Sequence, residues 1–189
     1  MDPEAVLDLF RKSGALLDGH FRLSSGLHSD RYLQSALVLQ YPEFAEALGR
    51  ALAERTRHLQ PTVVLSPALG GVVIGQEVGR ALGVRAIFVE RQDGTMTLRR
   101  GFALAPSDRV LVVEDVLTTG GSTRETAAVA EAIGSHVIGA ATIIDRGADS
   151  AELGLPLQAL VRLEVPAYPP ESCPLCAKGE AIVKPGSRV

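Results

Sequence analysis

Short, almost continuous apolar runs recur along the chain, at residues 62–66, 84–89, 110–113, 136–144 and 158–163. Runs of this length and composition predict strands that are buried on both faces, as in a parallel sheet. In the segments between them, apolar residues recur at helical spacing, most clearly at residues 42–59, 72–82 and 123–133. Strands that alternate with helices in this way predict an α/β fold, with a central, mostly parallel sheet flanked by helices.

Both ends of the chain depart from this alternation. A first helix, capped by Asp2, is followed by two segments at residues 20–24 and 29–34 that are expected to be extended. The tail, residues 166–189, is rich in proline and glycine, and no regular structure is predicted for it. No repeat or linker divides the chain, so residues 1–189 are expected to form a single domain.

The composition is that of an ordinary globular protein. Hydrophobic residues make up 46% and charged residues 22% of the 189 residues, and the formal net charge is -3. This charge gives no electrostatic reason to expect nucleic acid or an anionic membrane as a partner, and no apolar run approaches the length of a membrane span. The first residues, Met-Asp-Pro-Glu, lack the basic flank and apolar core of a signal peptide. A cytoplasmic location is therefore the default expectation.

The most informative segment is residues 110–123, where an apolar run ends in Glu114 and Asp115 and a loop rich in threonine and glycine follows. Free backbone amides and hydroxyls at the start of a helix are suited to binding a phosphate dianion. Two carboxylates beside a phosphate need another role, and ribose hydroxyls or a metal-bound diphosphate would suit them. The alternative is an ordinary strand-to-helix turn capped by Ser122 or Thr123. A Walker loop is excluded because no Gly-Lys-Ser/Thr sequence follows the turn.

This segment resembles the 5-phosphoribosyl 1-diphosphate (PRPP) signature of the type I phosphoribosyltransferases. The resemblance implies the type I phosphoribosyltransferase fold, in which a small hood (about 1–40 and 160–189) covers a PRPP-binding core (about 41–159). It also implies that the two acids hold the ribose hydroxyls, directly or through water, and that the loop holds the 5-phosphate. The PRPP-binding residues implied in this way are Glu114, Asp115, Val116, Leu117, Thr118, Thr119, Gly120, Gly121 and Ser122.

Residues 21–32, Phe-Arg-Leu-Ser-Ser-Gly-Leu-His-Ser-Asp-Arg-Tyr, look like the N-terminal element of the orotate phosphoribosyltransferases, which helps to form the base pocket. The segments 173–176 and 184–188 resemble the ending of one bacterial branch of that family. The resemblance thus covers nearly the whole chain. It implies transfer of the phosphoribosyl group from PRPP to orotate, giving orotidine 5-phosphate and diphosphate in the biosynthesis of pyrimidines (UMP).

Orotate carries a carboxylate, which arginine can match with two hydrogen bonds. By resemblance Arg146, just after the strand predicted at 136–144, binds this carboxylate. The other orotate-binding residues implied are Thr118, Ser24 and Tyr32, and His28 is a further candidate for the pocket wall. The alternative for Arg146 is a surface ion pair with Asp145 or Asp149. For Thr118 it is hydrogen bonding within the turn.

Two further loops resemble functional loops of the family. Ala68, Leu69, Gly70 and Gly71 resemble its diphosphate loop, whose backbone amides meet the diphosphate, although a plain β-to-α turn is the alternative. Residues 91–100 resemble its mobile catalytic loop, which closes over PRPP and excludes water. The catalytic candidates are Arg91, Arg99 and Arg100 on this loop, together with Asp115.

Better-known members carry lysines and a histidine on the catalytic loop, and a lysine where this chain has Gly70. Arginine keeps its proton at all working pH values. The role expected of the loop arginines is therefore electrostatic stabilisation of the leaving diphosphate, not proton donation. The alternative is a solvated, charged hairpin.

The resemblance implies Mg²⁺ as the cofactor, held mainly by the diphosphate of PRPP. It also implies a homodimer in which the mobile loop is shared between subunits. The competing class is a PRPP-sensing regulator that binds RNA or DNA, which would require a basic face or an added recognition domain. The slightly acidic composition is against that class, so the partners expected are PRPP and orotate, and neither nucleic acid nor a membrane.

Two cysteines, Cys173 and Cys176, form a Cys-Pro-Leu-Cys pair near the C-terminus. Such a pair supplies half of a tetrahedral zinc site, which two chains could complete across a dimer, or it could be redox-active. The interpretation favoured here is a tight turn whose thiols stay reduced. His20, His58 and His136 show no ligand-type spacing and are assigned no chemistry.

Overall fold

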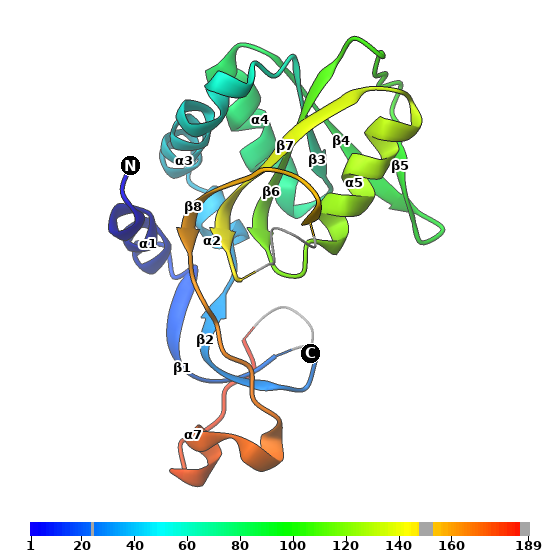
Figure 1. The fold of residues 1–189 in the computed structure, drawn as a ribbon. Coiled ribbons are helices and arrows are strands. Elements are labelled where there is room, and N and C mark those ends of the chain that lie inside the picture. Colours follow the sequence, from blue (N-terminus) through cyan, green and yellow to red (C-terminus); the bar gives the residue numbers. More distant parts are fainter. Residues whose placement is uncertain (24, 148–152, 186–189) are drawn as a thin grey trace.

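The computed structural model describes residues 1–23, 25–147 and 153–185, so Ser24 and Asp149 lie outside the described residues. Its larger sheet has six strands in the order β5-β4-β3-β6-β7-β8, and all are parallel except β5 (Figure 1). The strands are β3 (Val63–Pro67), β4 (Arg85–Gln92), β5 (Thr95–Leu98), β6 (Arg109–Leu117), β7 (His136–Asp145) and β8 (Leu157–Arg162). The predicted α/β fold is confirmed.

Alternating side chains of the central strands divide the core into two layers. Val64, Leu111 and Val113 pack with the helices α1 (Pro3–Lys12), α3 (Pro42–Thr56) and α4 (Gly70–Leu82). Val63, Val110 and Val112 face the other way and pack with α5 (Gly121–Ala132). Strands buried on both faces need apolar residues at every position, which explains why they read as continuous apolar runs.

Glycines let α4 lie unusually close to the sheet. A Cβ on Gly75 would stand 2.1 Å from Ser66 Oγ, and one on Gly79 would stand 2.8 Å from the Ala86 Cβ. Gly71 is equally constrained, because its Cβ would meet the Val113 carbonyl oxygen at 2.9 Å. This stripe of glycines sets the position of the α4 N-terminus beside the carboxyl end of β6.

The polar segment 91–100 forms an edge hairpin. The strands β4 and β5 pair antiparallel from Val89 and Leu98 to Gln92 and Thr95. Asp93 and Gly94 form the two-residue turn with φ of 51° and 84°, as expected for an Asp-Gly turn that joins twisted strands.

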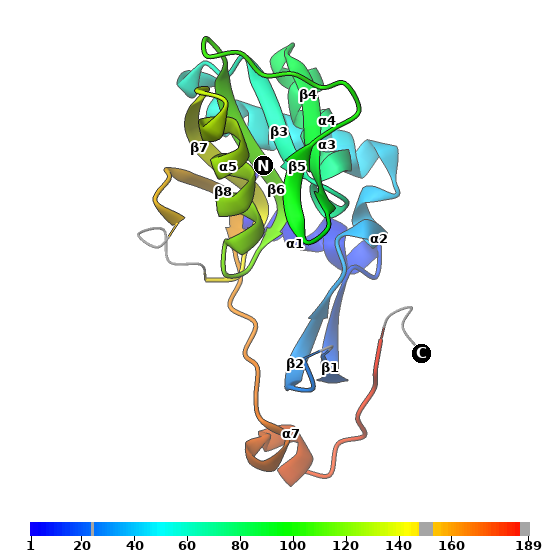
Figure 2. The ribbon, with the colours of Figure 1, turned by 90° about the vertical axis from the view of Figure 1, so that its right-hand side faces the viewer.

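The hairpin β1–β2 and the tail form a second unit below the carboxyl edge of the six-stranded sheet. β1 (Leu16–Arg22) and β2 (His28–Leu33) pair antiparallel. Past β8 the tail runs down one side of this hairpin and returns along the other (Figure 2), with bridges between His28 and Tyr168 and between Phe21 and Val183. We call residues 16–33 and 163–185 together the hairpin–tail unit.

The tail was predicted to have no regular structure, and this is wrong in two places. It forms a 3-10 turn, η2 (Pro170–Ser172), and a short helix, α7 (Pro174–Ala177). Each turn begins at a proline, whose fixed φ suits the first helical position. The short helix α2 (Ala36–Leu39) and the turn η1 (Arg57–Leu59) complete the regular elements of the described residues.

The predicted hood boundary at about residue 160 falls inside β8, and the division into hood and core stays a prediction. Among the described residues, no helix combines the length and the apolar character that crossing a membrane requires.

Candidate active site

The two neighbouring acids on β6 point to opposite faces of the sheet, because side chains alternate along a strand. The Glu114 carboxylate accepts a hydrogen bond from the hydroxyl of Thr123 on α5. The Asp115 carboxylate accepts one from the hydroxyl of Ser35, just before α2. Each acid lines its own pocket, so a ligand that reaches both must lie across the carboxyl end of β6.

The pocket on the Glu114 side has a volume of about 190 Å³ and is polar. Its floor is the segment from Thr118 to Ser122, which joins β6 to α5. Gly120 has a φ of 73°, which suits glycine, and no side chain caps the first N–H groups of α5. These donors and the helix dipole favour an anion at this end of the helix. The pocket therefore has the chemistry predicted for the 5-phosphate.

The pocket on the Asp115 side has a volume of about 350 Å³ and lies between α2 and the start of α4. Ser35, Leu69 and Gly70 line it together with Asp115. A Cβ on Gly70 would stand 2.6 Å from Asp115 Oδ1, so any larger residue at this position would require the carboxylate to shift.

The predicted diphosphate loop is brought to the acid pair, but its residues are not equivalent. Leu69 is 87% exposed and lines the Asp115 pocket with Gly70. Ala68 is partly buried, and its N–H donates to the Val89 carbonyl oxygen at 2.8 Å. Gly71 is buried against β6, so at that position the glycine serves close packing, which fits the plain β-to-α turn given as the alternative.

The environment of Glu114 favours its neutral form. Burial raises the pKa of Glu114, the hydrogen bond from Thr123 opposes this, and the nearby charge of Asp115 raises the pKa further. A cation or a hydroxyl-bearing ligand in the pocket would favour the charged form again. Such an acid is suited to binding a ligand, since its charge costs free energy in the empty pocket.

Arg146 lies at a strand end next to the end of β6, as predicted. Its N–H donates to the Leu117 carbonyl oxygen at 2.8 Å, which places it at the end of β7 next to the end of β6. Its Nη2 donates to the Val165 carbonyl oxygen at 3.5 Å. Its Nε is buried and has no hydrogen-bond partner among the described residues. Burial lowers the pKa of the guanidinium, which stays charged because arginine is so basic.

The three loop arginines do not lie together. Arg91 lines the Glu114 pocket and forms an ion pair with Glu125 of α5 at 2.8 Å. Arg100 donates twice to Glu90, each time at 2.9 Å, and this pair lowers the pKa of Glu90. Arg99 approaches the same carboxylate at 3.3 Å. Only Arg91 of the three is placed at the predicted phosphate site, whereas Arg99 and Arg100 fit the alternative of a charged hairpin.

The residues predicted for the base pocket are less clearly assembled. Tyr32 is partly buried on β2 and its ring lies 5.9 Å from that of Phe21. Ser24 falls outside the described residues. His28 does not point to the sheet: its Nδ1 lies 3.2 Å from Cys176 Sγ in the hairpin–tail unit.

Two side chains at the site were not predicted from the sequence. Ser35 is buried and donates to Asp115 from a segment without a recognisable motif. Arg124 extends from the first turn of α5, and its Nη1 donates to the Thr119 carbonyl oxygen at 2.9 Å. The position of Arg124 in the first turn of the predicted helix, next to the phosphate loop, could have indicated a role at the site. From the sequence alone, however, it cannot be told apart from an ordinary surface cation.

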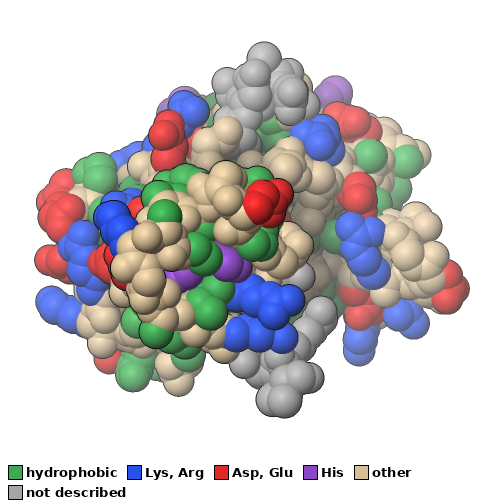
Figure 3. Space-filling view, turned by 90° about the horizontal axis from the view of Figure 1, so that it is seen from below, with side chains coloured by type: hydrophobic (Ala, Val, Ile, Leu, Met, Phe, Trp, Pro, Cys, Tyr) green, Lys and Arg blue, Asp and Glu red, His purple; other side chains and the backbone are tan. Residues whose placement is uncertain are grey.

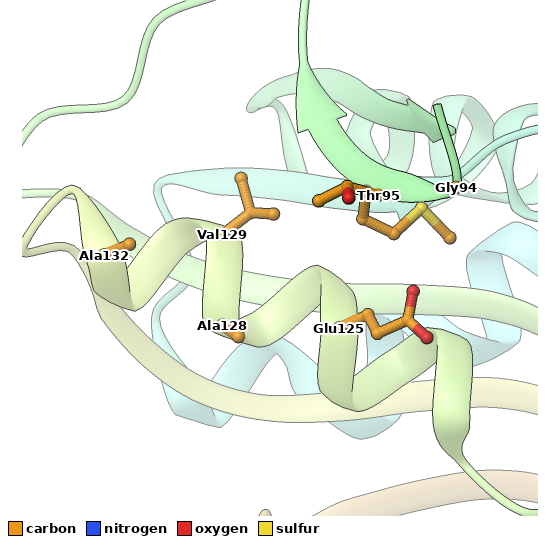
Figure 4. A pocket seen from close by; sticks show the side chains of 7 residues that line it. Gly94, Thr95, Glu125, Ala128, Val129 and Ala132 are labelled. Atoms are coloured by element: carbon orange, nitrogen blue, oxygen red, sulfur yellow. The ribbon is translucent and has the colours of Figure 1, made fainter. Parts of the chain in front are cut away.

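A larger depression of about 430 Å³ lies next to the Glu114 pocket, between the β4–β5 hairpin and α5 (Figure 4). Figure 4 shows Ala128, Val129 and Ala132 on one wall and Thr95 on the other. Glu125 is its one titratable lining residue. The depression is largely apolar, so the two smaller pockets remain the candidate active site.

Comparison with known proteins agrees with this geometry. A family model described as "Phosphoribosyl transferase domain" matches residues 35–153. A curated orotate phosphoribosyltransferase from Heliobacterium modesticaldum is 53% identical to the chain, and the match covers 100% of both proteins. One from Pelotomaculum thermopropionicum is 51% identical, over 100% of this chain and 99% of that protein. The crystal structure of Mycobacterium tuberculosis orotate phosphoribosyltransferase in complex with PRPP superposes with a TM-score of 0.68 at 26% identity, over 86% of this chain and 97% of that one.

Proposed function

The chain belongs to the phosphoribosyltransferase family and, within it, to the orotate phosphoribosyltransferases, and we propose that the two β6 pockets form its active site. There it transfers the phosphoribosyl group of PRPP to orotate, giving orotidine 5-phosphate and diphosphate for pyrimidine biosynthesis. The site lies where the strand order reverses between β3 and β6, at the carboxyl ends of the strands, which is the usual place for ligands in such sheets.

PRPP lies across the end of β6 in this proposal. The uncapped amides of α5, the hydroxyls of residues 118–122 and the Arg91 guanidinium hold the 5-phosphate. Asp115 and Glu114 accept hydrogen bonds from the ribose hydroxyls, directly or through water. Leu69 and Gly70 present backbone amides to the diphosphate in the Asp115 pocket. Arg124 adds a further cation beside the phosphate loop.

Orotate as the acceptor rests on one observation, the state of Arg146. Arg146 follows β7 next to the end of β6, and its buried Nε has no hydrogen-bond partner among the described residues, so the guanidinium is suited to an anionic ligand that can accept two hydrogen bonds. The orotate carboxylate meets that need and is fixed by it with its N1 toward the anomeric carbon. As the bond to diphosphate breaks, positive charge grows on the ribose ring beside Asp115 and Glu114, so the acids stabilise it.

Mg²⁺ is proposed as the cofactor. The carboxylate and hydroxyl oxygens around Asp115 are ligands of the kind Mg²⁺ accepts, and Gly70 leaves that carboxylate open toward the diphosphate loop. The ion would be held mainly by the diphosphate, with Asp115 nearby, and would neutralise charge on the leaving group. The chain itself supplies alignment, and Arg91 adds positive charge.

We also propose a homodimer in which the β4–β5 hairpin of one subunit reaches the active site of the other, and a cytoplasmic location. The hairpin stands at the sheet edge with three arginines, two of them engaged only by Glu90 among the described residues. The two cysteines are free, as is usual in a reducing compartment. Light scattering tests the dimer, and rescue of activity on mixing Arg99→Ala with Asp115→Asn subunits tests the shared site.

The reaction is tested by mixing the full chain with Mg²⁺, PRPP and orotate and following the loss of orotate absorbance. We expect turnover with orotate and none with adenine or uracil, because neither of those bases carries a carboxylate for Arg146. Turnover with adenine or uracil but not with orotate would assign the chain to another branch. Omitting Mg²⁺ and adding a chelator specific for magnesium is expected to stop turnover, which tests the cofactor separately.

A further inference from the structure

Four metal-ligating side chains meet in the hairpin–tail unit, two from each of two stretches that lie far apart along the chain. His20 lies on β1 and His28 at the start of β2, whereas Cys173 precedes α7 and Cys176 lies on it. The ligand atoms of these four residues all lie within 4.8 Å of one another. The sequence presented the cysteine pair as half of a site. The fold supplies the other half from the same chain, without a second subunit.

The spacing of the four atoms matches a small coordination shell. His20 Nε2 lies 3.1 Å from His28 Nδ1. Three of the four sulfur–nitrogen distances are 3.5 Å (Cys173 to His20), 3.7 Å (Cys176 to His20) and 3.2 Å (Cys176 to His28). A tetrahedron with Zn–S bonds of about 2.3 Å and Zn–N bonds of about 2.05 Å has N···N edges of about 3.3 Å and S···N edges of about 3.5 Å.

The second nitrogen of His20 is held as in many metal-bound histidines. His20 Nδ1 lies 2.8 Å from the Glu180 carbonyl oxygen, which can only accept a hydrogen bond. The proton is therefore on Nδ1, and the lone pair of Nε2 faces the cysteines. Such an outer hydrogen bond fixes the tautomer and the ring orientation of a ligand. Since Glu180 belongs to the returning limb of the tail, this contact also ties the tail to the cluster.

Burial separates the cluster from solvent on most sides. His20, His28 and Cys173 are 4%, 8% and 3% exposed, and only Cys176 is exposed. Seen from this end, histidine surface shows near the middle of the view among apolar side chains, with basic side chains next to it (Figure 3). Four ligating atoms that face one another, three of them on buried residues, have the arrangement that a structural metal site requires.

We propose that His20, His28, Cys173 and Cys176 bind one structural zinc ion within a single chain. Two thiolates and two imidazoles in a tetrahedral arrangement select Zn²⁺ among the common ions. All four positions are filled by protein, so no place remains for a substrate, and the ion joins the tail to the β1–β2 hairpin. The site lies outside the two β6 pockets, and its occupancy does not depend on the function proposed for them.

The test is metal analysis of the full chain expressed with Zn²⁺ in the medium and passed through gel filtration. We expect about one zinc per chain, with X-ray absorption showing two sulfur and two nitrogen neighbours at about 2.3 Å and 2.05 Å. Replacement by Co²⁺ should give the intense visible bands of a tetrahedral ion and a thiolate charge-transfer band. Absence of bound zinc, or oxygen neighbours in place of sulfur, would overturn the proposal.

Histidine variants supply a matched control, because the chain has four histidines and only two lie in the cluster. His28→Gln and Cys176→Ser should lose most of the zinc, whereas His58→Gln and His136→Gln should keep it. If a cluster variant fails to fold, the absorption and Co²⁺ spectra of the unaltered chain still decide the matter. A Cys173–Cys176 disulfide in freshly purified protein that binds no zinc after reduction would contradict the site.

Loss of the ion should act on the acceptor side of the reaction first, an expectation that rests on the proposed function. Tyr32, predicted for the base pocket, is on the same hairpin as His28. Stripping zinc with a chelator, with Mg²⁺ kept in excess, should raise the KM for orotate several-fold and leave PRPP affinity nearly unchanged. A chain that binds zinc but never uses orotate would contradict the proposed function and would still support the metal site.

Discussion

The carboxyl edge of the six-stranded sheet and the hairpin–tail unit solve the same problem, bringing polar groups together, in different ways. At the sheet edge, residues 110–123 already hold both acids and the phosphate loop, and parallel strands bring the remaining groups to the same edge. In the hairpin–tail unit, His20 and Cys173 are 153 residues apart in sequence and only the path of the tail unites them. The residues of the sheet-edge site are therefore close together in the sequence, whereas those of the hairpin–tail site come together only in the complete fold.

The two regions also differ in how their polar groups are satisfied. The sheet edge keeps open pockets, an uncapped helix and a guanidinium nitrogen without a partner among the described residues. The Cys/His cluster turns its ligands toward one another, and three of the four lie on buried residues. Unsatisfied groups in an open pocket indicate a transient ligand, whereas a closed set indicates a permanent one.

The largest expected effect separates the two regions at Arg146. Arg146→Ala removes the partner of the orotate carboxylate, at a cost of about 2–4 kcal/mol, or roughly 30- to 1,000-fold in the KM for orotate. PRPP affinity and zinc content should stay close to those of the unaltered chain. Steady-state kinetics and calorimetry with PRPP check this. A fall in PRPP affinity with an unchanged KM for orotate would reassign Arg146 to the phosphate side.

Asp115→Asn should give the next largest effect. Loss of charge-assisted hydrogen bonds to ribose costs about 1.5–3 kcal/mol, roughly 10- to 150-fold in kcat/KM for PRPP. Asp108→Asn is the matched control, because Asp108 lies just before β6, at the opposite end of that strand from Asp115, and pairs with Arg85 at 2.6 Å. That variant should alter thermal stability and leave PRPP binding intact. Equal kinetics for both variants would contradict the assignment of the acid pair to the PRPP site.

The loop arginines provide a smaller and sharper contrast. Arg91→Ala should weaken PRPP binding by about tenfold, the equivalent of one charge-assisted hydrogen bond. Arg100→Ala should change it less than about twofold, since Arg100 is engaged with Glu90. Calorimetric titration with PRPP measures both. If Arg100→Ala proves the more damaging, the hairpin must rearrange when PRPP binds.

The smallest expected effect is the pH dependence that Glu114 gives to stability. Its folded pKa is raised above the ordinary 4.5, so the native state holds the proton longer as pH rises. The free energy of unfolding should therefore fall as pH increases from 4.5 to the raised pKa, and this contribution should be flat above it. Glu114→Gln should remove that fall, as urea unfolding across the window would show, and an unchanged pH profile would contradict the burial of a charged Glu114.

A feature could be predicted from the sequence when the residues that cause it are close together in the chain. The apolar runs predicted the strands, and Asp2 predicted the start of the first helix, because burial and capping depend on residues that are neighbours in the sequence. The Asp2 cap is confirmed, since Asp2 Oδ1 accepts a hydrogen bond from the Ala5 N–H at 2.9 Å. The contact between Gly70 and Asp115 depends on the glycine stripe of α4, which no single segment reveals. Ser35 and His20 could not be assigned, because their partners lie 80 and 153 residues away.

The route of the tail has a consequence for how the molecule is made. A ribosome adds about 5–20 residues per second, so the interval between synthesis of His20 and of Cys173, 153 positions later, is roughly 8–30 s. Every strand of the large sheet is translated within that interval. The β1–β2 hairpin consequently waits with both of its edges uncovered until residues 163–185 have been translated and can pair with it.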